Sequence, residues 1–323
     1  MEIEIVKLVQ TLANGFNDVL FFLFTKFGEE IFFFAAFFIL WWCLGKSSSI
    51  KLLITYFVSV FANTALKSIV SRPRPHVASS EIVNKLPASG SSFPSGHSQS
   101  YANISGFLLF YNFKNVFTKT AKILIPICVL LFGIFGVGLS RLYFGQHYLT
   151  DVLAGLTIGF LISYLMVLFF KWFNKKVVFN KKTNIILSCA VVVSVLICNL
   201  VVMFTNFLSE KYALKIVVFS GLIFAIVLSF WLDENFIKYS PKEKTKFQLL
   251  KIIVGLSTTF GLYCMLNLFL KNILVLELIK YFVVSCFALI LLPFLFKIYK
   301  HKGSKMKIKT NEKVITNSEK ETR

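Results

Sequence analysis

Two arginines and a lysine near the end of an apolar segment form the first of three polar clusters in this sequence. Lys67 precedes Arg74 by seven residues, about two helical turns, so both side chains can point into one pocket. Pro73 and Pro75 disfavour helical geometry in the residues before them, so we expect Arg72 and Arg74 to be extended. A guanidinium group suits phosphate because it can bind two oxygens at once. Taken alone, however, the cluster is more typical of the basic end of a transmembrane helix.

The second cluster, Pro94-Ser95-Gly96-His97, stands immediately before an apolar segment. Ser95 can cap a helix there, and Gly96 lets an anion approach the free amide groups of the first turn. The positive end of the helix dipole favours the same anion. His97 on that turn can give a proton to a leaving group. An ordinary helix cap with an interfacial histidine explains these residues equally well.

The third cluster places a histidine and a carboxylate on one helical face. His147 and Asp151 are spaced i, i+4. A carboxylate that binds one imidazole nitrogen fixes the tautomer and leaves the other nitrogen free to attack, as in a catalytic triad. Arg141 stands six residues before His147, with Gly145 providing a turn between them. Such groups are costly to bury at a helix start, so an incidental polar patch is the weaker interpretation.

Apolar helices are the elements that must bring these clusters together. The chain has 323 residues, of which 56% are hydrophobic and 16% aromatic. Apolar runs near the roughly 20 residues that span a bilayer recur along it, without the alternation of barrel strands. The sequence therefore predicts an all-α, polytopic transmembrane helical bundle. The expected spans are 31–44, 52–70, 97–113, 123–139, 148–170, 185–206, 214–232, 249–270 and 281–297.

The net charge of +20 comes largely from lysines in short loops and at the C-terminal end. We expect these lysines to contact anionic lipids rather than nucleic acid. The lysine-rich loops fall on one side by alternation, and the positive-inside rule makes that side cytoplasmic. The loop 76–96, whose only lysine is Lys85, then lies on the extracytoplasmic side together with the three clusters. The six cysteines stand in apolar runs without metal-ligand spacing, so we expect neither a disulfide framework nor a zinc site.

Together the three clusters resemble the signatures of the type 2 phosphatidic acid phosphatase (PAP2) superfamily, Lys-x6-Arg-Pro, Pro-Ser-Gly-His and Ser-Arg-x5-His-x3-Asp. The matching residues are Lys67 with Arg74-Pro75, then Pro94 to His97, then Ser140-Arg141, His147 and Asp151. We expect an N-terminal amphipathic, interfacial segment (1–27), a PAP2-like catalytic core (28–172), additional transmembrane helices (173–297) and a basic cytoplasmic tail (298–323).

The resemblance implies a role for each matched residue. His147 would be the nucleophile that forms a phosphohistidine, Asp151 would orient it, and His97 would protonate the leaving alkoxide and then activate water. The residues that would hold the phosphoryl oxygens are Lys67, Arg74, Ser95, Gly96 and Arg141. These cations supply the positive charge that phosphoryl transfer requires, so we expect neither a metal nor a cofactor. Arg72 matches no signature position and is given only an auxiliary role.

This pattern predicts an integral-membrane phosphatase acting on a lipid phosphate or pyrophosphate, with its active site on the extracytoplasmic face of a bacterial inner membrane. Two alternatives stay open. A transporter or binding protein for anionic phospholipid headgroups would use the cations without hydrolysis, and a metal hydrolase would use both histidines and Asp151. The pocket fits phosphatidate, phosphatidylglycerophosphate, undecaprenyl diphosphate, lipid A and soluble sugar phosphates. We expect loop 76–92 and the C-terminal helices to determine specificity.

Overall fold

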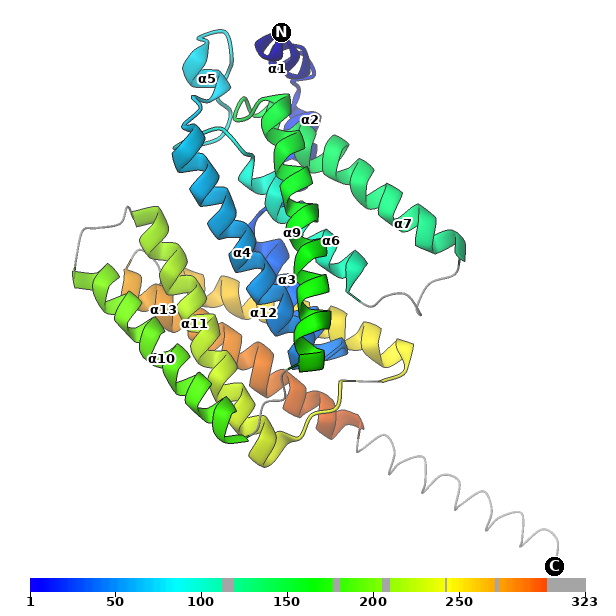
Figure 1. Ribbon diagram of the computed structural model, residues 1–323, viewed down its shortest axis with the longest axis vertical. Coiled ribbons are helices and arrows are strands. Elements are labelled where there is room, and N and C mark those ends of the chain that lie inside the picture. Colours follow the sequence, from blue (N-terminus) through cyan, green and yellow to red (C-terminus); the bar gives the residue numbers. More distant parts are fainter. Residues whose placement is uncertain (112–118, 177–180, 205–209, 242, 271–272, 301–323) are drawn as a thin grey trace, which may run out of the picture. The chain divides into compact units, whose positions relative to one another are not determined.

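The computed structural model describes residues 1–111, 119–176, 181–204, 210–241, 243–270 and 273–300, and every regular element in these ranges is helical (Figure 1). The prediction of an all-α transmembrane bundle with additional C-terminal helices is confirmed. The helices form two compact units, of which the first is Met1–Phe37 with Lys46–Val178 and the second is Phe38–Gly45 with Phe179–Arg323. Most of the expected basic tail, residues 301–323, lies outside the described residues.

The first unit carries all three polar clusters. Its elements are α1 (Glu2–Gln10), α2 (Gly15–Thr25), the 3-10 turn η1 (Lys26–Gly28), α3 (Glu30–Cys43), α4 (Lys46–Val70), α5 (Pro75–Ala78), α6 (Gly96–Phe110), α7 (Lys119–Leu131), the π-helical segment η3 (Phe132–Gly138), α8 (Leu139–Tyr143) and α9 (Leu149–Lys176). The last turns of α3 belong to the second unit.

The second unit is made of the C-terminal helices and the end of α3. Its further elements are α10 (Lys181–Phe204), α11 (Glu210–Leu232), the π-helical segment η4 (Asp233–Ile237), α12 (Thr245–Phe269), α13 (Leu274–Cys286) and the π-helical segment η5 (Phe287–Leu291). Within this unit, α11 packs along α13. The buried ammonium group of Lys251 on α12 donates to the backbone carbonyls of Trp42 and Pro241, each at 2.9 Å. This lysine therefore ties α12 to the end of α3.

Several helices in the described part of the chain are long and apolar enough to cross a membrane, and the protein is an integral membrane protein. The six that qualify are Lys46–Ala78, Leu124–Tyr143, Leu149–Asn174, Ala213–Ile237, Thr245–Phe269 and Leu274–Lys300. The helix α6 is not among them, because it has only 15 residues and its first turns are polar. Its buried Gln99 donates to the carbonyl of Ser59 at 2.8 Å, and Asn103 donates to Ser163 Oγ at 3.1 Å. These bonds attach α6 to α4 and α9, so its polar face lies inside the protein.

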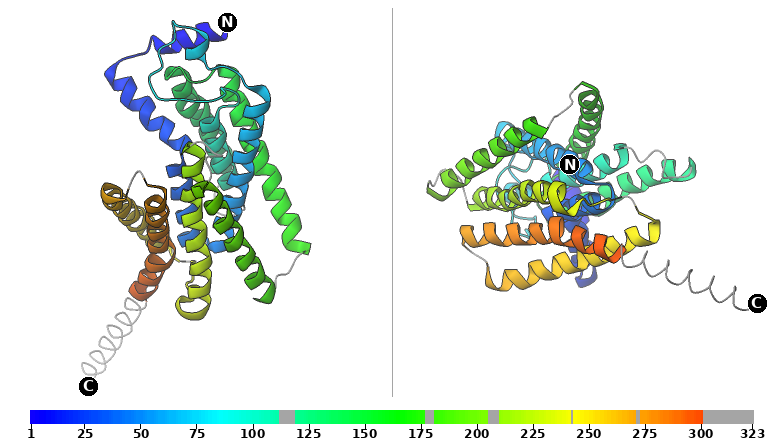
Figure 2. Two further views of the ribbon diagram at one scale, coloured as in Figure 1. Left: turned by 90° about the vertical axis from the view of Figure 1, so that its left-hand side faces the viewer. Right: turned by 90° about the horizontal axis from the view of Figure 1, so that it is seen from below.

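Helices α6 and α9 lie side by side, and this contact brings the second and third clusters together (Figures 1 and 2). Gly155 and Gly159 of α9 face α6, as small residues do where two transmembrane helices approach closely. A Cβ atom at Gly155 would lie 2.6 Å from the carbonyl oxygen of Ser95, so no larger residue fits there. The start of α6 is therefore fixed next to the start of α9.

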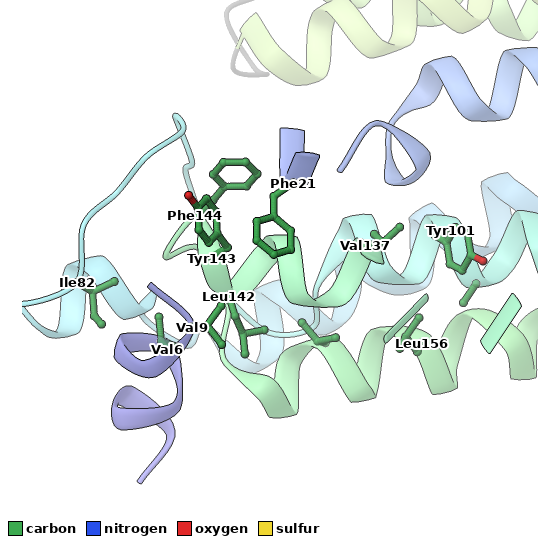
Figure 3. Close-up of a cluster of buried hydrophobic side chains, with 12 residues drawn as sticks. Val6, Val9, Phe21, Ile82, Tyr101, Val137, Leu142, Tyr143, Phe144 and Leu156 are labelled. Carbon is green, nitrogen blue, oxygen red and sulfur yellow. The ribbon is translucent and has the colours of Figure 1, made fainter. Parts of the chain in front are cut away.

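A cluster of buried apolar side chains surrounds α8, the short helix of the third polar cluster (Figure 3). Val6 and Val9 from α1 and Phe21 from α2 contribute to it, beside Leu142 and Tyr143 of α8. The rings of Phe21 and Tyr143 have centroids 4.4 Å apart. The two N-terminal helices thus pack against the short helix that carries Arg141.

Candidate active site

Arg74 is held beside the site by the way α4 ends. Ser71 adopts a left-handed conformation with φ of +46°, which ends the helix α4 after Val70. Arg74 follows in an extended conformation, with φ of −75° and ψ of 156°, as the flanking prolines predict. Its guanidinium group is buried and donates to the carbonyl of Ser89 at 2.8 Å and to that of Gly90 at 3.0 Å. The loop before α6 therefore fixes the direction of this cation.

Lys67 reaches the same loop from the last turn of α4. Its ammonium group donates to the carbonyl of Ser91 at 2.7 Å. The backbone amide of Ser92 in turn donates to the carbonyl of Arg72 at 2.8 Å. The first cluster and the loop are thus bound together through both side-chain and backbone groups.

The second cluster begins α6 in the way that the sequence predicts. Ser95 is the buried N-cap residue, and its hydroxyl accepts a hydrogen bond from the amide of Ser98 at 3.4 Å. The backbone amide of Ser95 donates to the carbonyl of Asp151 at 2.9 Å, which joins this cap to α9. Half-buried His97 is the second residue of the helix, and Gly28 of η1 lies against its backbone. A Cβ atom at Gly28 would be 2.6 Å from His97 Cβ, so η1 is closely fitted to this histidine.

Arg141 lies on α8 and is almost completely buried, with 3% of its surface exposed. Its Nη1 atom donates to the hydroxyl of Thr25 at the end of α2. Its Nε atom is buried and has no hydrogen-bond acceptor among the described residues. A buried guanidinium with an unpaired N–H group favours the binding of an anion, because leaving a charged donor without an acceptor in the interior costs free energy.

His147 lies in the turn between α8 and α9, and its contacts define its tautomer. Gly145, with φ of +68°, makes the turn that presents it. The ring atom Nε2 is 3.3 Å from Nη1 of Arg74. Because a guanidinium group can only donate, Nε2 must be the acceptor, and the ring proton is on Nδ1. The nitrogen that carries the lone pair therefore faces the cation of the first cluster.

The protonated nitrogen of His147 faces Asp151. The distance from Nδ1 to Oδ2 is 3.6 Å, slightly longer than a hydrogen bond. Asp151 is fully buried, and its Oδ2 atom accepts the amide of Tyr148 at 2.9 Å and the hydroxyl of Ser92. Its Oδ1 atom accepts a hydrogen bond from Arg72 at 2.8 Å. Asp151 is the third residue of α9, and the hydrogen bond that it accepts from the amide of Tyr148 caps the N-terminus of this helix.

Burial and the neighbouring cations lower the pKa of His147 and so favour its neutral imidazole. Burial lowers its pKa, the carboxylate of Asp151 acts in the opposite direction, and Arg141, Arg74 and Lys67 lower it further. Burial disfavours the charged ring, and like charges nearby have the same effect. A neutral imidazole with a lone pair on Nε2 is the form that can act as a nucleophile.

The site has further contact residues, and two of the three carry no signal in the sequence. Thr25 contacts Arg141, which is 116 positions away in the sequence. Ser92 and Arg72 both contact Asp151. Only Arg72 could be noticed, because of its place beside Pro73. Within the described part of the chain, no group of three or more His, Cys, Asp or Glu residues is arranged to hold a metal ion.

Comparison with protein-family models gives two matches on this chain. Residues 48–175 match the model described as PAP2 superfamily, and this range contains all three clusters. Residues 217–304 match the model described as PAP2 superfamily phosphatase, transmembrane extension. The two matches divide between the N-terminal core and the C-terminal helices.

Two curated proteins of Bacillus subtilis are similar to this chain. One is phosphatidylglycerophosphatase B, 34% identical over 116 residues, which cover 36% of this chain and 52% of that protein. The other is undecaprenyl-diphosphatase BcrC, 30% identical over 132 residues, which cover 40% of this chain and 63% of that protein. The matched part of the chain thus spans 52% and 63% of the length of these two relatives.

Among solved structures, the chain is similar to a transmembrane PAP2 type phosphatidylglycerolphosphate phosphatase from Bacillus subtilis. The TM-score is 0.46 at 23% sequence identity, and the match covers 55% of this chain and 87% of that one. The evidence for the family is the two model matches and the three polar clusters, which lie within the first of these matches. The chain therefore contains a PAP2 superfamily domain, followed by the transmembrane extension of PAP2 superfamily phosphatases.

Proposed function

We propose that this protein is a metal-independent membrane phosphatase that hydrolyses a lipid phosphate or pyrophosphate through a phosphohistidine intermediate. The observation that carries this proposal is the placement of His147. Its Nε2 lone pair faces Arg74 at 3.3 Å, and its Nδ1 proton faces the buried carboxylate of Asp151 at 3.6 Å. A binding protein would need the cations of this site, but it would not need an oriented, neutral imidazole among them.

In the first step, Nε2 of His147 attacks the phosphorus atom. The new N–P bond forms as the bond from phosphorus to the ester oxygen breaks, and His97 gives its proton to the departing alkoxide. Asp151 stabilises the positive charge that develops on the imidazole. In the second step, His97 takes a proton from water, whose oxygen attacks phosphorus and releases inorganic phosphate and neutral His147.

The cations stabilise the charge on the phosphoryl oxygens during both steps. We assign this role to Lys67, Arg74 and Arg141, with the Ser95 hydroxyl and the Gly96 amide at the start of α6. The unpaired Nε of Arg141 supports this assignment, since it is a buried donor without an acceptor in the described structure. Fixed donors are effective here because phosphoryl transfer depends mainly on positioning and charge stabilisation.

The proposed substrate class is a lipid with a terminal phosphate or diphosphate. The names of the two curated relatives support this class, one acting on phosphatidylglycerophosphate and the other on undecaprenyl diphosphate. The test is phosphate release by the purified protein in detergent from these two lipids, phosphatidate and a soluble sugar phosphate. We expect turnover of at least one lipid and a much lower kcat/KM for the sugar phosphate. Binding of the lipids without phosphate release would favour a binding or transport function instead.

Chelation of metal ions should leave the activity unchanged, whereas vanadate should inhibit it. Vanadate adopts a trigonal bipyramidal geometry that resembles the pentavalent phosphorus attached to His147. The cations of the chain provide the charge that a metal ion would otherwise supply. The measurement is the initial rate of phosphate release with EDTA and with increasing vanadate. Loss of activity in EDTA that Mg²⁺ or Zn²⁺ restores would contradict the proposed mechanism.

The site should face away from the cytoplasm, at the outer leaflet of a bacterial inner membrane. The positive-inside rule places the exposed Ser89 of the loop before α6 on that side, and the exposed Asn174 at the other end of α9 in the cytoplasm. In a cysteine-free protein, a membrane-impermeant thiol reagent applied to intact cells should label Ser89→Cys and leave Asn174→Cys unlabelled. The reverse pattern would place the site in the cytoplasm.

A further inference from the structure

Arg72 has no part in the proposed mechanism, yet its side chain meets the carboxylate of Asp151. Its Nη1 atom donates to Asp151 Oδ1 and to Thr150 Oγ1, each at 2.8 Å. Its guanidinium lies over the ring of Tyr148, with Cζ 3.9 Å from the ring centroid. These three partners begin α9, so Arg72 connects the end of α4 to the turn that carries Asp151.

The other end of this guanidinium is bound by α1. Its Nη2 atom donates to Oε2 of Glu2. The second carboxylate oxygen of Glu2 accepts the hydroxyl of Thr150 at 2.6 Å and its backbone amide at 3.2 Å. A carboxylate is favourable at the first turn of a helix, where backbone amides are unpaired and the dipole is positive. Glu2 thus caps α9, at the end of the unit where Figure 1 shows α1 and the start of α9.

We propose that Glu2 and Arg72 are positioning residues that hold the Asp151 carboxylate in the orientation that His147 requires. This inference rests on the proposed function of the site. Asp151 is fully buried, and Arg72 is the cation bound to its Oδ1 atom at 2.8 Å. That bond fixes the rotation of the carboxylate, and the rotation determines how Oδ2 faces Nδ1 of His147.

The contacts of Arg72 differ from those of the cations that we assign to phosphate binding. Both of its terminal nitrogens have carboxylate partners, one on Asp151 and one on Glu2. Arg141, in contrast, has a buried nitrogen with no acceptor among the described residues. Arg72 should therefore act on the rate of the chemical step through Asp151, rather than on the binding of the phosphate group.

The test compares kcat and KM of the purified full-length protein with those of Arg72→Gln, Arg72→Lys and Glu2→Gln. Arg72→Gln should lower kcat about 10- to 100-fold with little change in KM, since small errors in the position of catalytic groups have effects of this size. Arg72→Lys should retain an intermediate kcat, because it keeps the charge beside Asp151 but cannot reach Glu2 as well. Glu2→Gln should lower kcat by about fivefold, as expected for a partly exposed ion pair.

A double variant shows whether Glu2 acts through Arg72. If it does, Glu2→Gln should have no further effect on kcat in a protein that already carries Arg72→Gln. Lys7→Gln is the matched control, because Lys7 also ties α1 to the loop through Glu81 but has no described contact with Asp151. This control should keep the kcat of the wild-type protein, and its thermal unfolding should report any loosening of α1.

If the wild-type protein is active, three results would overturn this inference without overturning the proposed function. These are an unchanged kcat in Arg72→Gln, a raised KM with unchanged kcat, and independent, multiplying effects of Glu2→Gln and Arg72→Gln. A fall in kcat for Lys7→Gln equal to that for Glu2→Gln would assign the effect to the packing of α1 and overturn the role of Glu2. A wild-type protein that releases no phosphate would overturn the proposed function, and this inference with it.

Discussion

Replacing His147 with alanine should lower phosphate release by a factor on the order of 10⁴ or more, because the attack on phosphorus is assigned to its imidazole. The cations would still bind the phosphate, so the loss should appear in kcat rather than in KM. His147 is buried in the turn before α9, and its described contacts are with Arg74 and Asp151. Steady-state phosphate release from a detergent-dispersed lipid phosphate measures the effect.

A second histidine close in space provides the control for this variant. His76 on α5 binds the carbonyl of Gly145 through Nδ1 at 2.9 Å, and it has no role in the mechanism. His76→Gln keeps a donor at this place and should retain most of the wild-type rate. Near-normal turnover by His147→Ala, in a preparation with the same thermal unfolding as wild type, would exclude His147 as the nucleophile.

Asp151→Asn should lower kcat on the order of 10³- to 10⁴-fold, because an amide cannot satisfy the groups around this carboxylate. The Oδ1 position faces a donor from Arg72, and the Oδ2 position faces the amide of Tyr148. An amide nitrogen at either position therefore meets another donor. At the Oδ2 position it would also favour the wrong tautomer of His147, with the proton on the nitrogen that must attack.

Asp18→Asn is the matched control for this charge removal. Asp18 accepts hydrogen bonds from Lys85 and Tyr143, both at 2.6 Å, on the exposed surface of the same unit. Its substitution should change kcat within about twofold, as for surface positions that do not contact the site. Equal losses from Asp18→Asn and Asp151→Asn would indicate a general loss of folding, and they would contradict a specific role for Asp151.

The helices and the polar clusters could be predicted from the sequence because their signals are local. Proline spacing predicts the extended Arg74, and a serine before a glycine predicts the cap of α6. The i, i+4 spacing correctly pairs His147 with Asp151, but the two do not share a helical face: His147 lies in the turn before α9, and its Nδ1 is 3.6 Å from Oδ2 of Asp151. These features depend on residues within one or two helical turns of each other.

The partners of these residues could not be predicted, because they depend on how distant segments pack. Thr25 and Ser92 reach Arg141 and Asp151 only through the folding of α2 and of the loop before α6. The sequence of α6 does not indicate which groups bind its polar residues, because their hydrogen-bond partners lie on α4 and α9. Glu2 likewise stands in a segment whose sequence indicates only an amphipathic helix.

If His147 carries the phosphoryl group during turnover, the phosphorylated protein can be trapped before it is hydrolysed. Purified protein is mixed with a lipid phosphate labelled with ³²P at its terminal phosphate and is denatured within milliseconds. We expect a labelled protein whose phosphate is stable in alkali and lost in acid, as is typical of phosphohistidine, and no label in His147→Ala. Label that is stable in acid, or that persists in His147→Ala, would contradict this role of His147.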